Sequence, residues 1–259
     1  MEQGSEPDLG ALLRDANEEQ LAALIGGRLD EIDVRAARQA FRNPFLTGSL
    51  IEALAASPGL SAAYELRREV VLHPRAPRLL ALRLVSGLYW ADLVRVGTDA
   101  RLHPTVRRAA DQRLIERLPG LSAGEKIAVA RSADAAVIAA LRLDPTPRVI
   151  DALLDNPRLT EGLLVPLAAS DRASPLVLAR VAANPRWGVR PGIRYALCRN
   201  PATPLTAAFA LLSLLTKREL EAVAHDLRLA LPLRRRAQLL SGSPGPGRRP
   251  SAAPGGARD

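Results

Sequence analysis

The chain has 259 residues, of which 47% are hydrophobic and 24% charged, so it is long enough and apolar enough to bury a substantial core. Alanine and leucine contribute 45 residues each, which favours helices, whereas aromatic residues make up only 3%, which argues against an all-β sandwich or barrel. The single cysteine, Cys198, excludes an internal disulfide framework and a cysteine-ligated zinc or iron–sulfur centre.

The formal net charge of +9 is of the size that suggests binding to nucleic acid or to an anionic membrane. Lys126 and Lys217 are the only lysines, so 34 of the 36 basic residues are arginine. An excess of arginine together with alanine, leucine and proline is also typical of a GC-rich coding sequence. We therefore interpret the charge first as a consequence of composition.

The N-terminal segment, residues 1–29, is expected to form a helical cap. Its first eight residues are acidic and include no apolar stretch, so no signal peptide is visible. The longest strongly apolar run, residues 207–215, is far shorter than the roughly 20 residues that span a bilayer. We therefore expect a soluble, cytoplasmic protein that is monomeric and does not enter a membrane.

Two segments of the chain recur later in it. Residues 43–57 align without gaps to residues 156–170, with nine of fifteen positions identical at an offset of 113. From His73 onward the chain aligns to Asn200 onward at an offset of 127, with these matches among others: Pro74/Pro201, Pro77/Pro204, Asp99/Asp226, Arg101/Arg228, Arg107/Arg234 and Arg108/Arg235. Matched Asn-Pro and Asp-x-Arg positions are not a product of composition, so we infer an internal duplication.

The duplication predicts two helical-repeat halves, residues 30–142 and 143–241. Because the offset rises by fourteen between the two aligned blocks, we expect the second half to have gained one short helix within residues 171–184.

Polar residues followed by proline punctuate both halves. The residue before proline is pushed out of the α region, and proline itself is favoured in a first helical turn. Each pair therefore predicts a helix boundary, with the residue before proline as a cap of the next helix. The pairs begin at Asn43, Ser57, His73, His103, Asp144, Asn156, Asn184 and Asn200.

The segment 76–87 is apolar around most of its helical circumference, which predicts a helix covered by neighbours on both sides. No segment shows the alternation and hairpin turns of β-strands. The sequence therefore predicts an all-α fold of short, stacked helices.

A familiar pattern appears at residues 99–110, Asp-Ala-Arg-Leu-His-Pro-Thr-Val-Arg-Arg-Ala-Ala, which resembles the second half of a HEAT repeat. Residues 199–204 (Arg-Asn-Pro-Ala-Thr-Pro) and 155–160 (Asp-Asn-Pro-Arg-Leu-Thr) resemble the related leucine-rich-repeat-variant pattern. The resemblance covers residues 30–240 and implies a right-handed superhelical solenoid. It also implies that Asp99 and Arg107, and in the second half Asp226 and Arg234, are structural ladder residues.

Helical phase separates neighbouring arginines. On a helix that starts at Pro104, Val106 and Ala110 share one side with the leucines that follow, so Arg107 lies on the flank of the apolar arc and Arg108 faces away. We expect Arg107 to be partly buried and to reach a carboxylate or carbonyl of a neighbouring turn, with Asp99 as the first candidate. The same disposition is expected of Arg234, Arg235 and Asp226.

The C-terminal segment 242–259 is rich in glycine, proline and serine, and is expected to be a disordered tail.

Residues that could carry chemistry are few. The three histidines, His73, His103 and His225, lack the spacing of metal ligands, so no metal or cofactor is expected. Cys198 lies in an apolar stretch, as a small core residue would. No phosphate-binding, dinucleotide-binding or serine-nucleophile motif is present.

The scarce aromatic residues admit two interpretations. Trp90, with Asp92 close by, could stack a nucleic-acid base beside a carboxylate, as in HEAT-like DNA glycosylases. The simpler interpretation is that Trp90 and Trp187 fill gaps at helix turns.

Three functions follow, in order of preference. The first is a non-enzymatic helical-repeat scaffold that presents a surface to a protein partner. The alternative is a nucleic-acid-binding solenoid, with Arg108, Arg235 and Trp90 as contacts. A HEAT-like DNA glycosylase is a distant third. All three rest on analogy at the level of the fold.

Overall fold

The computed structural model describes residues 8–242, so the expected tail lies outside the described residues except at Gly242. Helices account for 69% of this part of the chain, and it contains no β-strand. The all-α prediction is therefore confirmed. The chain divides into two compact units, residues 1–140 (unit 1) and 141–259 (unit 2).

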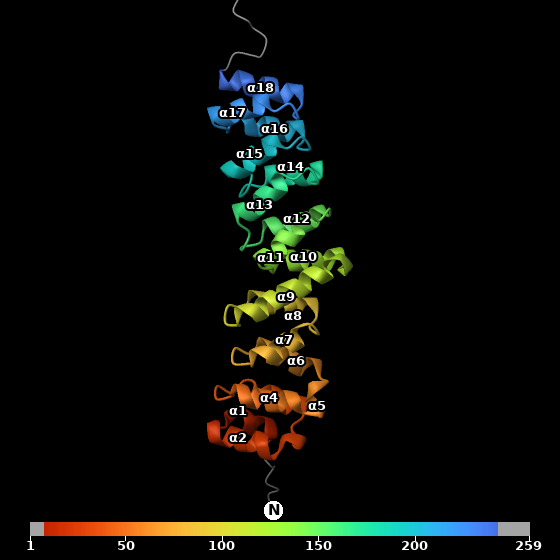
Figure 1. The fold of residues 1–259 in the computed structure, drawn as a ribbon, viewed down its shortest axis with the longest axis vertical. Helices are drawn as coiled ribbons and strands as arrows, with labels where there is room; N and C mark the ends of the chain where they lie inside the picture. Colours follow the sequence, from red (N-terminus) through yellow and green to blue (C-terminus); the bar gives the residue numbers. More distant parts are fainter. Residues whose placement is uncertain (1–7, 243–259) are drawn as a thin grey trace, which may run out of the picture. The chain divides into compact units, whose positions relative to one another are not determined.

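In unit 1 the helices lie in two rows (Figure 1). Helices α2, α4, α6, α8 and α10 pack in sequence along one row, while α1 packs on α3 and α7 on α9 in the other. The bounds are α1 (Leu9–Asp15), α2 (Glu18–Gly27), the 3-10 turn η1 (Leu29–Glu31), α3 (Val34–Ala40), α4 (Gly48–Ala56), α5 (Pro58–Ser61), α6 (Tyr64–Leu72), α7 (Arg78–Val85), α8 (Trp90–Thr98), α9 (Pro104–Arg117), the 3-10 turn η2 (Leu118–Gly120) and α10 (Ala123–Ser132).

Unit 2 shows the same alternation. Helices α12, α14, α16 and α18 form one row, and α13, α15 and α17 form the other. The bounds are α12 (Pro147–Leu154), α13 (Glu161–Ala168), α14 (Pro175–Ala183), α15 (Pro191–Arg199), α16 (Leu205–Leu212), α17 (Lys217–His225) and α18 (Leu231–Ser241), with α11 (Ala135–Leu141) spanning the unit boundary. Each helix buries one apolar face between the rows, as Leu164, Leu178 and Leu197 do, each fully buried.

A helix lies within residues 171–184, where the sequence predicted a gained one. This helix, α14, has nine residues and packs between α12 and α16. Between the corresponding aligned segments of unit 1 the chain has α6 and the four-residue α5, which packs on α4 and α6.

The Xaa-Pro pairs mark helix boundaries, but most of them end a helix instead of capping the next one. Proline opens a helix after Ser57 and His103. At Asn200, by contrast, α15 has just ended, and the side-chain Oδ1 accepts the backbone N–H of Ala202 at 2.9 Å. Its Nδ2 donates to the carbonyls of Ala168 and Ser170, at 2.8 and 2.9 Å, at the end of α13.

Asn43 makes the same kind of link in unit 1. Its Nδ2 donates to the carbonyls of Leu13 and Ala16 at the end of α1, and its Oδ1 accepts from the N–H of Phe45. Asn43 and Asn200 are both buried. An amide group supplies a donor and an acceptor at once, so one side chain closes its own turn and satisfies the orphan carbonyls of an earlier helix.

Arginines also link turns about thirty residues apart. Arg75 donates to the carbonyl of Pro44 at 2.5 Å, Arg117 to those of Ser86 and Leu88, and Arg186 to that of Asn156. Part of the arginine content is therefore structural.

The sequence predicted which surfaces of α7 and α9 are buried, and the structure contradicts the prediction for α7 and confirms it for α9. Helix α7 is not covered on both sides, because Leu79 is 76% exposed where the groove between α4 and α7 lies open. Helix α9 has the expected phase: Val106, Ala110 and Leu114 are buried, Arg107 is half-buried and Arg108 is exposed. Helix α18 ends at Gly242, whose φ of 69° is the left-handed conformation that glycine adopts most readily.

No helix within residues 8–242 is long and apolar enough to cross a membrane.

Candidate binding surface

The turns that contain Asp99 and Asp226 have the same geometry in the two units. In each, the aspartate accepts the backbone N–H and the guanidinium of the arginine two residues later. Arg101 donates from Nε and NH2 to Asp99 at 3.0 and 2.7 Å, and Arg228 donates to Asp226 at 3.1 and 2.8 Å. Each carboxylate is thus held in a bidentate ion pair within its own turn.

The structure therefore does not pair Asp99 with Arg107 or Asp226 with Arg234 by hydrogen bonds. The Nε of Arg107 is buried and has no hydrogen-bond partner among the described residues. Arg234 is half-buried, and its Nε donates to the carbonyl of Ala224 in the preceding helix at 3.4 Å. Arg101 and Arg228 therefore form the ion pairs that the sequence analysis expected of Arg107 and Arg234.

The residues singled out for nucleic acid lie apart in the fold. Arg108 is exposed on α9, and its Nε contacts the carbonyl of Pro104 in its own helix. Arg235 is exposed on α18 in unit 2. Trp90 is half-buried at the start of α8, where its indole N–H donates to Glu125 of α10 at 2.9 Å, so the ring links two helices.

The carboxylate near Trp90 is also committed to the fold. Asp92 is 8% exposed, and it accepts a hydrogen bond of 2.5 Å from the hydroxyl of Tyr64. Tyr64 in turn accepts the backbone N–H of Tyr89 at the start of α8. The three residues tie α6 to α8.

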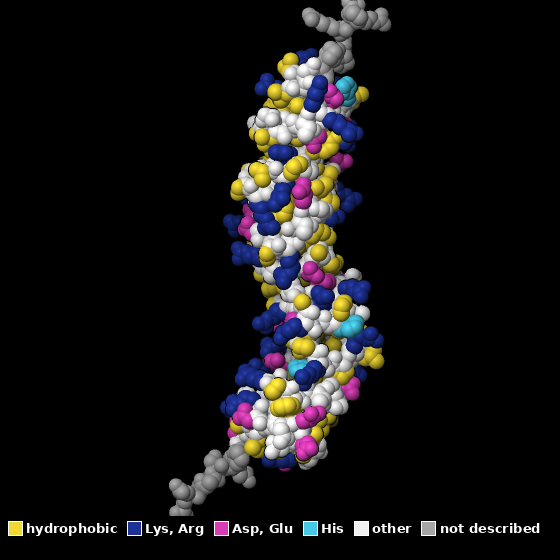
Figure 2. Space-filling view, turned by 90° about the vertical axis from the view of Figure 1, so that its left-hand side faces the viewer, with side chains coloured by type: hydrophobic (Ala, Val, Ile, Leu, Met, Phe, Trp, Pro, Cys, Tyr) yellow, Lys and Arg dark blue, Asp and Glu magenta, His cyan; other side chains and the backbone are white. Residues whose placement is uncertain are grey.

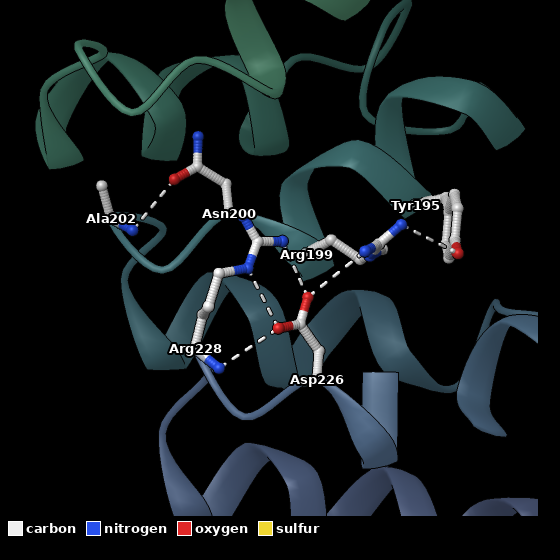
Figure 3. A network of polar contacts seen from close by, with 6 residues as sticks. All are labelled: Tyr195, Arg199, Asn200, Ala202, Asp226 and Arg228. Atoms are coloured by element: carbon white, nitrogen blue, oxygen red, sulfur yellow. Dashed lines mark hydrogen bonds and ion pairs between the residues drawn. The ribbon is translucent and has the colours of Figure 1, made fainter. Parts of the chain in front are cut away.

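A second arginine joins the ion pair of unit 2 (Figure 3). Arg199, the last residue of α15, places NH2 3.4 Å from Asp226 and NH1 3.5 Å from the hydroxyl of Tyr195. Hydrogen bonds from the side chain of Arg228, then from its backbone and from Arg199, lower the pKa of Asp226 to about 2 despite the burial of this carboxyl.

This network closes one end of a groove between α13 and α15. The groove has a volume of about 380 Å³, and its walls combine small apolar residues with a charged end. The lining residues are Val165, Ala169, Asp171, Gly192, Tyr195, Ala196, Arg199 and Arg228.

Local interactions fix both sides of the groove. Glu161 at the start of α13 accepts the backbone N–H of Gly192 in the first turn of α15 at 2.8 Å. A Cβ at position 192 would lie 2.6 Å from that carboxylate, so a larger residue there would displace the Glu161 side chain from this hydrogen bond. At the other end of α15, Asn200 is bonded to the end of α13, which fixes the backbone next to Arg199.

The net charge of the protein resides in unit 2. Residues 1–140 contain 18 Lys and Arg and 18 Asp and Glu, whereas residues 141–259 contain 18 and 9. On the face that Figure 2 shows, the Lys and Arg side chains are interspersed with acidic and apolar ones and do not form one continuous stripe.

Unit 1 has two larger hollows. A groove of about 590 Å³ lies between α1 and α2, lined mainly by alanine and leucine. Its rim charges are paired, Asp15 with Arg14 and Arg28 with Glu31. A second groove of about 470 Å³ lies between α4 and α7 beside the exposed Leu79.

The remaining candidate residues serve the fold. Burial raises the pKa of the Cys198 thiol to about 12, so this core residue is not a nucleophile. Trp187 is 2% exposed and donates to the carbonyl of Leu154, filling a gap at a turn as expected. Within residues 8–242 no group of three or more His, Cys, Asp or Glu side chains is arranged to hold a metal ion.

Sequence reasoning did not single out Arg199 or Tyr195. One signal was present: in the alignment at an offset of 127, the cationic Arg199 faces the apolar Leu72. That the cation reaches Asp226 depends on the packing of α15 against α17, which the sequence pattern does not reveal.

Comparison with known proteins finds no matching family model, curated protein or solved structure.

Proposed function

We propose that the protein is a non-enzymatic helical-repeat scaffold that holds an acidic protein partner on unit 2. The observation that carries the proposal is the separation of charge between the units, with unit 1 balanced and all nine surplus positive charges in unit 2. Each unit contains 17 arginines, so the surplus of unit 2 comes from its smaller number of Asp and Glu residues, nine against eighteen, which a compositional bias toward arginine does not explain.

The architecture supports a binding role. In each unit, short helices in two rows create long lateral surfaces, and links about thirty residues apart hold the rows together. The shared Asp-x-Arg turns, and the aligned Asn43 and Asn156 that each accept the backbone N–H two residues later, support the further proposal of an internal duplication within a right-handed superhelix. Solenoids of this kind use their extended surfaces for binding.

The nucleic-acid alternative is supported by the same charge surplus, but of the residues singled out for it only Arg235 lies in unit 2. Trp90 and Arg108 lie in unit 1, where charges balance. At least nine arginines besides Arg199 form ion pairs with Asp or Glu, and five more donate to backbone carbonyls. A protein that tracks phosphates needs its cations free for them.

Affinity capture with the full-length protein tests this proposal, with and without nuclease treatment. We expect an acidic protein to be retained after nuclease treatment at about 0.1 M salt and released at about 1 M, because the Debye length then falls to a few ångströms. Retention that disappears with nuclease would favour the nucleic-acid alternative. Retention that is indifferent to salt would contradict a partner held through charge.

A further inference from the structure

The groove between α13 and α15 joins an apolar floor to a cationic end. Val165 and Ala169 contribute the floor from α13, and Gly192 and Ala196 contribute it from α15. Arg199 and Arg228 lie at the charged end together with Asp171. All of these residues belong to unit 2, which has the positive surplus.

Arg199 is not needed to neutralise Asp226. Arg228 already holds both carboxylate oxygens, at 3.1 and 2.8 Å, whereas Arg199 approaches only to 3.4 Å. The turn of Asp99 shows that one arginine is sufficient to pair with the carboxylate, because Arg101 alone makes the equivalent hydrogen bonds there. The position aligned with Arg199 in that half is Leu72.

Arg199 is therefore a surplus guanidinium at the edge of an apolar groove. Its side chain is 42% exposed, and its second contact, to the Tyr195 hydroxyl, is at the 3.5 Å limit of a hydrogen bond. A planar guanidinium with weakly engaged N–H groups matches a carboxylate, which it can bind with two parallel hydrogen bonds.

The charges around Arg199 limit what the groove accepts. Asp171 and Asp226 lie beside the two arginines of this end, so a continuous run of phosphates would meet two carboxylates. A ligand with one carboxylate next to an apolar side chain satisfies both parts of the groove. The volume of about 380 Å³ is sufficient for a few residues of extended peptide.

We propose that the α13–α15 groove binds a peptide segment of the partner protein, with an apolar side chain over Ala169 and Ala196 and an adjacent Asp or Glu carboxylate on Arg199. The proposal rests on the proposed function and adds to it the place and the chemistry of recognition.

Phage display tests this proposal. Peptides are selected from a random 12-residue library with the full-length protein as bait. The selected peptides should contain Asp or Glu beside Leu, Ile or Val. The strongest binder is then synthesised with a fluorescent label, both as selected and with its acidic residues replaced by their amides. Fluorescence anisotropy gives the affinity of each form.

Two variants of equal charge locate the binding. Arg199→Leu introduces the residue that the first half has at the aligned position, and Arg235→Leu removes an exposed arginine of the same unit far from the groove lining. We expect Arg199→Leu and the amide peptide each to weaken binding by about tenfold or more, which is the loss of roughly one charge-assisted hydrogen bond. Arg235→Leu should weaken binding by less than about twofold, since exposed charges act mainly through screened fields.

Each variant is first compared with the wild type by circular dichroism and thermal unfolding, and Arg199→Lys provides a second test if Arg199→Leu is unstable. Lysine keeps the positive charge but lacks the planar guanidinium that can make two parallel hydrogen bonds. The affinity of Arg199→Lys for the peptide should therefore fall between those of the wild type and the leucine variant. Equal losses in Arg199→Leu and Arg235→Leu, or selected peptides without acidic residues, would overturn the groove assignment.

The same variants distinguish this failure from failure of the proposed function. If affinity capture retains an acidic protein that Arg199→Leu still binds, the scaffold stands and the groove assignment is wrong. If a labelled 20-nucleotide single strand binds more tightly than any selected peptide and both variants weaken it alike, the nucleic-acid alternative replaces both proposals.

Discussion

At the scale of single residues, Asp111 is the most unusual carboxyl in the protein. It lies on α9, is 5% exposed and faces Gly97 of α8 so closely that a Cβ there would lie 2.2 Å from its Oδ1. Burial, and then the charge of Asp134, raise the pKa of Asp111 to about 6, and the nearby Arg107 acts in the opposite direction. Unit 1 therefore contains a carboxylate that is poorly compensated at neutral pH.

Replacing Asp111 with asparagine should stabilise the protein at pH 7.5 by about 2 kcal/mol, since a shift of one pKa unit corresponds to about 1.4 kcal/mol. The folded state binds the proton more tightly than the unfolded chain, so the wild type loses stability as pH rises from about 4 to about 6. Below that window the acid is neutral in both states, and Asp111→Asn should match the wild type. Urea unfolding at pH 4 and pH 7.5 measures both differences, and a gain of equal size at the two pH values would contradict this account.

The half-buried Arg107 provides a related test. Arg107→Ala removes the only cation that lowers the pKa of Asp111, and should destabilise the protein at neutral pH by about 1–3 kcal/mol. The exposed neighbour is the control, because Arg108→Ala should change the free energy of unfolding by no more than about 0.5 kcal/mol. Chemical denaturation of the two variants gives the comparison. Similar losses would show that Arg107 has no special role.

Residue roles were only partly predictable. The phase of α9 followed from apolar spacing, so the different exposures of Arg107 and Arg108 were predicted. The partner of Asp99 was not, because an Asp-x-Arg turn closes locally before α9 is reached. Arg199 and Asp226 are 27 residues apart in the chain and meet through the packing of α15 and α17.

At the scale of elements, the Asn-Pro turns illustrate what local sequence conveys. Proline indicates correctly that a helix boundary is near. It does not indicate which side of the boundary the asparagine serves, because the Nδ2 partners of Asn43 and Asn200 are carbonyls 27 to 32 residues earlier in the chain. The direction of capping is thus determined by tertiary packing.

Asn200→Ala should cost about 2–3 kcal/mol of stability, because it leaves the carbonyls of Ala168 and Ser170 without their donor in addition to opening its own turn. Asn184→Ala is the matched control. The Asn184 side chain accepts the backbone N–H groups of Arg186 and Trp187 within its own turn, so the loss should be about 1 kcal/mol. Thermal and urea unfolding measure both, and equal losses would mean that the link between turns contributes nothing.

At the scale of the whole molecule, composition predicted the helical class. The chain divides into compact units at 140/141. The distribution of charge could have been read from the sequence once that boundary was known. The fold is needed to interpret this distribution, because it shows which arginines are held in ion pairs. It also shows that Arg228 already pairs with Asp226, which leaves Arg199 as a surplus cation beside a groove.

The central claim, that a protein partner is held on unit 2, is tested most directly by site-specific photo-crosslinking in cells that naturally produce the protein. A photoreactive phenylalanine analogue is placed at the exposed Pro166, next to Val165 of the α13–α15 groove, or at the exposed Leu79 of unit 1. We predict a nuclease-resistant protein adduct from position 166 that is absent or far weaker from position 79. An adduct that forms equally well from both positions, or one that nuclease removes, would contradict the account.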